Sequence, residues 1–167
     1  MTARPANRTP AKDESSAVKP VETVIAEHPF LKGLKPEYIR LLTSYAMRMQ
    51  FKENELIFRE GDPANRFYLI EEGLVALEAP RLDEPGQQIQ TVGPGEPLGW
   101  SWLYPPYLWH FDALAIEPTT AIFFYGTRLR EACDVDHDLG YELMKRMTQV
   151  VIQRLQATRK QLTNAPH

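Results

Sequence analysis

The sequence predicts a mainly β fold with flanking helices: an antiparallel roll or sandwich, preceded by short helices and followed by one long C-terminal helix. Three observations predict it. Between residues 49 and 125, short apolar runs alternate with Gly, Pro and Asp turn formers at spacings of about ten residues. The same stretch contains no helical crossover of the length that a parallel sheet needs. On both sides of it, apolar residues recur at helical spacing.

Length and composition exclude several classes of protein. A chain of 167 residues with 43% hydrophobic and 25% charged residues is typical of one globular domain. No apolar run approaches the roughly 20 residues of a membrane span, and the polar N-terminus contains no signal peptide, so we expect no membrane association. The single cysteine, Cys133, fits a reducing compartment, and we expect a cytoplasmic protein. A net charge of −3 disfavours a nucleic-acid binder.

We expect three segments along the chain. Residues 1–20 are polar and rich in proline, which predicts a disordered N-terminal arm, because they bury too little apolar surface to offset the entropy of ordering. Residues 21–135 form the β domain with its N-terminal helices. Residues 136–163 form the long helix, with Asp134 or Asp136 available as its N-cap. The predicted strands are residues 49–51, 55–58, 67–70, 74–77, 89–92, 113–116 and 121–125.

The long helix carries two apolar stripes. Leu139, Leu143, Met147 and Val150 form the first, which predicts that the helix packs on its own domain. The second has the alternating four- and three-residue spacing of a coiled-coil seam. Its members are Met144, Thr148, Val151, Leu155, Thr158 and Leu162. One wide buried face is the alternative, but a helix this long extends beyond a small roll and exposes the second stripe. We therefore predict a homodimer through this seam.

Residues 28 to 75 carry motifs in a fixed register. They are His28-Pro-Phe-Leu-Lys-Gly-Leu34 with Pro36-Glu37, then Phe51-x-x-x-Glu55-x-Ile57-Phe58-x-x-Gly61-Asp62, and Phe67-Tyr68-x-Ile70-x-x-Gly73-x-Val75. Gly61 and Gly73 stand where hairpin turns require a positive φ. Together the motifs resemble the cyclic-nucleotide-binding domain family, the sensor module of catabolite-activator-like regulators. The resemblance covers about residues 21–163 and implies an antiparallel double-stranded β-roll (jelly roll) with N-terminal helices and a long C-terminal helix.

The resemblance also implies a ligand cassette between two late strands of the roll. In the family, a glutamate in a Phe-Gly-Glu-like turn holds the ribose hydroxyl, and an arginine before the next strand neutralises the cyclic phosphate. Here residues 95–103 occupy the first place, with Trp100 where the glutamate would be, and residues 108–111 contain no arginine. Lysine and arginine are absent from Leu82 to Thr127. A buried phosphodiester without a cation costs several kcal/mol, so we expect no ordinary cAMP or cGMP binding.

Aromatic residues occupy the cassette instead. The candidate ligand-binding residues are Gly99, Trp100, Ser101, Trp102, Trp109, His110 and Phe111. Two interpretations stay open. In the first, the rings plug the vacated pocket as part of the core. In the second they are functional, and form either a stacking pocket for a flat, uncharged or anionic small molecule or an exposed patch for a protein partner. A third alternative is a true cyclic-nucleotide binder in which Arg59, Arg66 or His110 replaces the missing arginine.

The sequence offers no catalytic, metal-binding or cofactor-binding constellation. Of the four histidines only His110 falls among the predicted strands, whereas the metal site of a cupin-type roll needs several. Cys133 is best explained as a buried structural thiol. Ser101 lacks the Gly-x-Ser-x-Gly frame of a nucleophilic serine. We therefore predict no enzymatic activity.

The C-terminal helix is followed by too few residues for the helix-turn-helix that the resemblance implies for DNA-binding members, so we expect no DNA binding by this chain. Its basic residues are expected on a solvated face: Lys145, Arg146, Arg154, Arg159 and Lys160. The sequence thus predicts a non-enzymatic, stand-alone, cytoplasmic and homodimeric regulatory sensor module. The alternative is a protein-interaction adaptor whose pocket is filled by its own aromatic residues.

Overall fold

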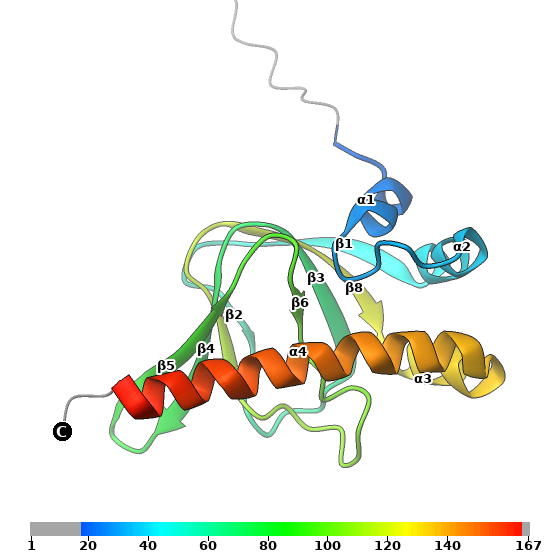
Figure 1. Cartoon of the computed structure of the whole chain (residues 1–167). Helices are drawn as coiled ribbons and strands as arrows, with labels where there is room; N and C mark the ends of the chain where they lie inside the picture. The colour runs from blue at the N-terminus through cyan, green and yellow to red at the C-terminus, as the bar shows by residue number, and fades with distance from the viewer. Residues whose placement is uncertain (1–17, 165–167) are drawn as a thin grey trace, which may run out of the picture.

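Two four-stranded antiparallel sheets face each other and form a β-roll in the computed structural model, which describes residues 18–164 (Figure 1). One sheet has the strand order β1-β8-β3-β6 and the other β2-β7-β4-β5. The strands are β1 (Ala46–Phe51), β2 (Leu56–Phe58), β3 (Arg66–Glu72), β4 (Val75–Arg81), β5 (Glu84–Val92), β6 (Pro97–Leu98), β7 (Asp112–Ala115) and β8 (Thr119–Tyr125). The predicted antiparallel roll is confirmed.

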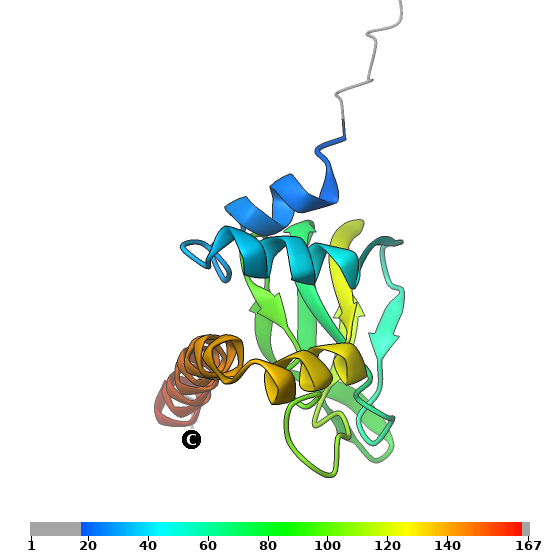
Figure 2. The same ribbon diagram turned by 90° about the vertical axis from the view of Figure 1, so that its right-hand side faces the viewer.

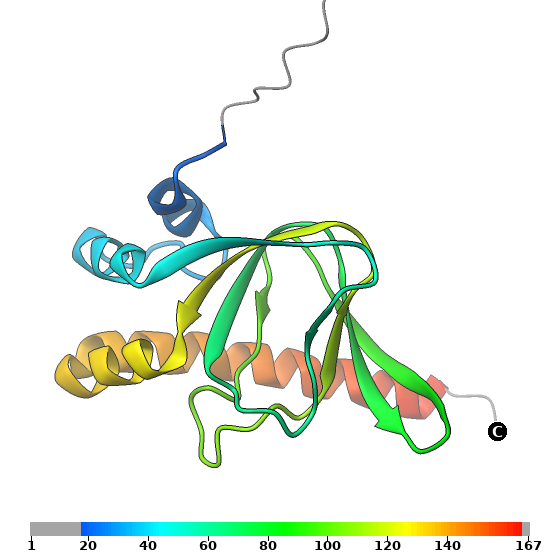
Figure 3. The ribbon, with the colours of Figure 1, turned by 180° about the vertical axis from the view of Figure 1, so that it is seen from behind.

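Within the described residues, four helices flank the roll. They are α1 (Val21–Glu27), α2 (Pro36–Ser44), α3 (Gly126–Val135) and α4 (His137–Asn164). Figure 2 shows α1 with α2 and α3 with the start of α4 as two groups in front of the strands. Seen from behind, α4 runs along the roll and ends beside the β4–β5 hairpin (Figure 3). Gln161 donates a hydrogen bond to the carbonyl of Ile89 within β5.

The residues of β3 and β8 alternate between two cores. Phe67, Leu69, Ile122 and Phe124 face the helices and pack in one apolar cluster with the buried stripe of α4. Their neighbours along the strands face the other sheet and fill the inside of the roll; they include Tyr68, Ile70, Ala121 and Phe123. This period-two alternation is the physical origin of the strand pattern in the sequence.

Local sequence features explain where the elements begin and end. Pro36 begins α2, at a position where its missing N–H costs nothing. Asp136 caps α4, because its Oδ1 accepts hydrogen bonds from the N–H groups of Asp138 at 3.1 Å and Leu139 at 3.2 Å. Gly73 has the positive φ, 99°, that its turn requires, and a Cβ there would lie 2.5 Å from the Pro118 carbonyl oxygen.

The structure adds to the predicted elements in two places. The predicted strands at residues 74–77 and 89–92 are the inner ends of a longer hairpin, whose outer part is polar and exposed and so lacks an apolar pattern. The two-residue strand β6 was not predicted. The predicted disordered arm, residues 1–20, lies outside the described residues except for residues 18–20. Among these three, the backbone carbonyl of Lys19 accepts a hydrogen bond from Arg48.

Candidate functional site

The cassette is the connection between β6 and β7, residues 99–111. It begins at Gly99, whose φ of 93° favours glycine. A Cβ at this position would lie 2.6 Å from Cζ3 of Trp109, closer than real Cβ contacts allow. Gly99 therefore lets the indole ring of Trp109 lie directly against the backbone at the start of the cassette.

Trp109 occupies the inside of the roll. Its side chain is 5% exposed and stacks on Phe58 with ring centroids 3.8 Å apart and an interplanar angle of 8°. Tyr68 and Phe123 belong to the same cluster. The cavity that remains beside the ring has a volume of about 10 Å³, whereas small-molecule pockets measure about 300–1,000 Å³. The chain's own indole thus fills this part of the roll.

The other predicted cassette residues fall into two groups. On the outside, Trp100 is half-buried and stacks on His110 at 4.8 Å, while the Oγ of the buried Ser101 hydrogen-bonds Nδ1 of the exposed His110 at 2.9 Å. Trp102 is buried in the core beneath the helices, and its ring centroid lies 5.5 Å from that of Phe67. Phe111 lines the small cavity beside Trp109. Six of the seven predicted residues, all except Trp102, thus line the small cavity beside Trp109.

Of the three residues that the sequence offered as replacements for the missing arginine, Arg59 and Arg66 do not line this cavity. Arg59 is exposed in the turn after β2. The guanidinium of Arg66 stacks over the Phe123 ring at 4.3 Å and lies 3.7 Å from the sulfur of Met49. His110 is the only one of the three that lines the cavity.

Arg154, which the sequence interpretation missed, does reach the cassette from α4. Its Nη2 donates a hydrogen bond to the Pro97 carbonyl at 2.8 Å, and its side chain lines the cavity beside Trp109. Burial lowers the pKa of Arg154, and the negative charge of Glu96 partly opposes that shift. The expectation of a solvated basic face is therefore wrong for this residue. Its position four residues after Val150 continues the buried stripe and could have indicated it.

Arg146 is a second correction to the expected solvated face. Its Nη1 donates hydrogen bonds to the carbonyls of Phe30 at 2.9 Å and Lys32 at 3.1 Å. It thereby ties α4 to the loop between α1 and α2. Two of the five basic residues of the helix are thus anchors to the domain.

The two stripes of α4 differ in exposure. Leu139, Leu143, Met147 and Val150 are buried against the domain. On the second stripe, Leu155 is 68% and Leu162 75% exposed. Met144 and Thr148 are also exposed, and Val151 and Thr158 are half-buried. The same spacing continues upstream to the exposed Tyr141, which the sequence interpretation did not include. The dimer interface itself stays a prediction.

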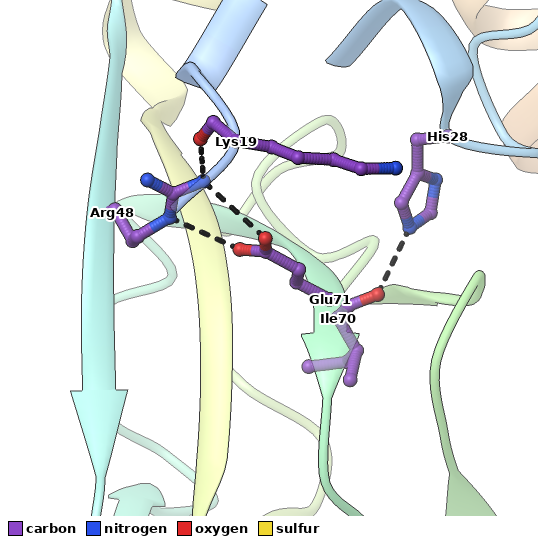
Figure 4. Close-up of polar contacts among 5 residues, drawn as sticks. All are labelled: Lys19, His28, Arg48, Ile70 and Glu71. Atoms are coloured by element: carbon purple, nitrogen blue, oxygen red, sulfur yellow. Dashed lines mark hydrogen bonds and ion pairs between the residues drawn. The ribbon is translucent and has the colours of Figure 1, made fainter. Parts of the chain in front are cut away.

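A separate cleft of about 570 Å³ lies between α1 and the outer face of the β1-β8-β3 sheet. Figure 4 shows its polar contacts. Arg48 and Glu71 form an ion pair at 3.1 Å, and Lys19 pairs with Glu27 at 3.1 Å. Because these charged groups pair with each other, the cleft indicates no specific ligand.

His28 closes the same cleft and is held as the neutral tautomer. Its Nε2 donates to the Ile70 carbonyl at 3.2 Å, and its Nδ1 accepts from the Phe30 N–H at 3.2 Å. Burial lowers the pKa of His28. The Nε2 contact joins the α1–α2 loop to β3, and the Nδ1 contact, which lies within that loop, requires the neutral ring.

Three further observations bear on chemistry and location. No group of three or more His, Cys, Asp or Glu side chains within residues 18–164 is arranged to hold a metal ion. Burial raises the pKa of the Cys133 thiol to about 11, so the thiolate is disfavoured at neutral pH. None of the helices in that range is long and apolar enough to cross a membrane.

The two-sheet β-roll, the loop cassette and the long C-terminal helix agree with the architecture that the family resemblance implies. Residues 48–136, more than half of the chain, match the family described as cyclic nucleotide-binding domain. The chain belongs to this family, and it is a regulatory module of that kind.

Curated relatives agree with the family. The cyclic AMP receptor protein of Thermus thermophilus is 29% identical over 123 residues, which cover 71% of this chain and 57% of that protein. A CRP-like cAMP-activated global transcriptional regulator of Mycobacterium tuberculosis is 23% identical over 144 residues, 86% of this chain and 62% of that protein. The chain therefore spans about three fifths of the length of these relatives.

Solved structures share the fold. A protein of Geobacter metallireducens described as cyclic nucleotide-binding has a TM-score of 0.72 and 27% identity, and the match covers 83% of this chain and 98% of that one. A cyclic nucleotide-binding domain of Methylobacillus flagellatus has a TM-score of 0.76 at 20% identity, covering 87% and 84%. At that identity the second likeness concerns the fold alone.

Proposed function

We propose that this chain is a non-enzymatic regulatory module that works without cAMP or cGMP, because its own Trp109 occupies the place of a ligand. The observation that carries the proposal is the stacking of Trp109 on Phe58 at 3.8 Å, which leaves a cavity of about 10 Å³. That volume holds about one water molecule and no nucleotide. Among the functions left open by the sequence, this geometry favours the interaction adaptor with a filled pocket.

Polar chemistry supports the same proposal. The position of the family's ribose-binding glutamate is Trp100, whose ring lies on His110. Loss of a charge-assisted contact at a buried phosphate costs about 2–5 kcal/mol, or about 30- to 4,000-fold in affinity. Arg154 does not restore the phosphate contact, since the space beside it is too small for a phosphate group. Binding would also require Trp109 to leave the core.

The second part of the proposal is a homodimer formed through the α4 seam, Met144, Thr148, Val151, Leu155, Thr158 and Leu162. The exposure of Leu155 and Leu162 supports it, since burying each leucine would contribute about 1.5–3 kcal/mol. The two threonines fit the seam because their hydroxyls already donate to the helix carbonyls of Met144, at 2.8 Å, and Arg154, at 2.9 Å. Their methyl groups are thus free to pack.

Titration calorimetry tests the absence of nucleotide binding. We expect no saturable heat with cAMP or cGMP when the nucleotide reaches about 100 µM, because a family-type micromolar site weakened by the factors above falls to about millimolar or beyond. The Thermus thermophilus cyclic AMP receptor protein serves as the positive control for the nucleotide stocks. Saturable micromolar binding of either nucleotide would overturn the proposal and favour the alternative of a binder with non-standard residues.

A further inference from the structure

Arg154 is a half-buried cation whose guanidinium has an unfinished set of contacts. It follows the buried stripe with which α4 packs on the domain, on the helix that passes β6 in Figure 1. Nη2 donates to the Pro97 carbonyl at 2.8 Å. Nη1 is also buried but has no hydrogen-bond acceptor among residues 18–164. An unsatisfied buried N–H of a charged group is costly, so an acceptor at this place would stabilise the fold.

The positive charge of Arg154 also lacks a direct counter-charge. In the part of the chain that the structure describes, no carboxylate lies within 4.0 Å of its guanidinium. Glu96 acts on it only from a greater distance. A water molecule would supply a hydrogen-bond acceptor but no charge, whereas an anion would supply both.

The cavity lined by Arg154 limits the size of the occupant. Its volume is about 10 Å³, and its walls are mainly apolar, among them Phe58, Leu77 and Leu98, with polar atoms from Ser101 and His110. That space holds about one atom-sized guest. Phosphate, sulfate and carboxylate groups are too large, whereas a monatomic anion is the smallest group that supplies both an acceptor and a charge, and it needs the least widening of this space.

We propose that Arg154 and the cassette form a binding site for a monatomic anion of the halide class, which joins α4 to the cassette. The anion would accept a hydrogen bond from the Arg154 guanidinium and balance its charge. Because the site needs only Arg154 and the cavity walls, it is independent of the proposed function.

Crystallography in sodium bromide tests the site directly. We expect an anomalous bromide peak in contact with the Arg154 guanidinium, and no such peak in crystals grown in sodium gluconate. A water molecule at this place in both salts would overturn the proposal, and so would an empty cavity in both. This measurement uses the wild-type chain and does not depend on the folding of any variant.

Thermal unfolding gives a second readout in solution. At constant ionic strength, replacing gluconate by bromide should raise the midpoint by about 3–6 °C for each tenfold increase in bromide above its dissociation constant. Arg154→Met should abolish this dependence, because methionine extends the apolar stripe without a charge. Arg146→Met is the matched control: Arg146 is also a half-buried anchor on α4, but it lies 3.8 Å from Glu142 and does not line the cavity, so the dependence should remain. Equal bromide dependence in wild type and Arg154→Met would overturn the proposal.

Discussion

Replacement of Trp109 by alanine tests how the roll is filled. The indole is 5% exposed and lies on Phe58 at 3.8 Å. Removing a large buried aromatic side chain costs about 3–5 kcal/mol, of which the stacked pair contributes about 0.5–1.5 kcal/mol. For a domain of this size that loss lowers the unfolding midpoint by about 6–20 °C. Urea unfolding followed by far-UV circular dichroism measures the change in the free energy of unfolding.

Trp100→Ala is the matched control, because it removes the same side chain from the same cassette. Trp100 is half-buried and its stacking partner His110 is exposed, so this change should cost about 1 kcal/mol or less. Indole added in solution should raise the midpoint of Trp109→Ala by filling the new cavity and leave wild type unchanged. If Trp109→Ala costs no more than Trp100→Ala, Trp109 does not fill the core and the reasoning is refuted.

Two further predictions concern the seam and His28. The double variant Val151→Lys, Leu155→Lys should sediment as a monomer, because lysine at these positions prevents packing of the seam. Gln153→Lys, at an exposed position off the seam, should leave the dimer intact. A wild-type chain that is monomeric at micromolar concentration would contradict the predicted seam. Burial lowers the pKa of His28 in the folded state, so its contribution to stability is complete above the ordinary value of 6.5 and is lost as pH falls through the folded-state pKa. Urea unfolding across this range should show a steeper loss on acidification for wild type than for His28→Gln, and equal slopes would contradict the assignment.

The roll could be predicted from sequence because its strands alternate between two apolar cores. The predicted strand at residues 121–125 shows this alternation. Ala121 and Phe123 face the inside of the roll, while Ile122 and Phe124 face the helices. Strand β6 carries no comparable pattern. Its two residues pair with β3, Leu98 opposite Tyr68, and this pairing depends on how the whole roll closes.

The candidate site could be predicted only in composition. The sequence indicated an aromatic cassette without the family's glutamate and arginine, but not which ring turns inward. Trp102 and Trp109 are equally apolar, and their different destinations depend on partners distant in sequence, Phe67 for one and Phe58 for the other. Arg154 was missed for the same reason, since its acceptor Pro97 lies 57 residues away along the chain.

Trp109 and Arg154 line one cavity, so their replacements should not act independently. In wild type in sodium gluconate, where the proposed halide is absent, the buried Nη1 of Arg154 has no acceptor among the described residues, and Arg154→Met relieves that cost while losing the contact with Pro97. In Trp109→Ala, the enlarged cavity beside the guanidinium admits water, which solvates the same group and leaves less cost to relieve.

Arg154→Met should therefore be more favourable in wild type than in Trp109→Ala, by about 0.5 kcal/mol or more, as is usual for residues that share a cavity. Urea unfolding of wild type, the two single variants and the double variant gives this coupling free energy. The control cycle of Trp109 with Arg146 should be additive, because Arg146 contacts the α1–α2 loop instead of the cavity. Additivity of the Trp109 and Arg154 changes within about 0.3 kcal/mol would show that the two side chains do not share one cavity.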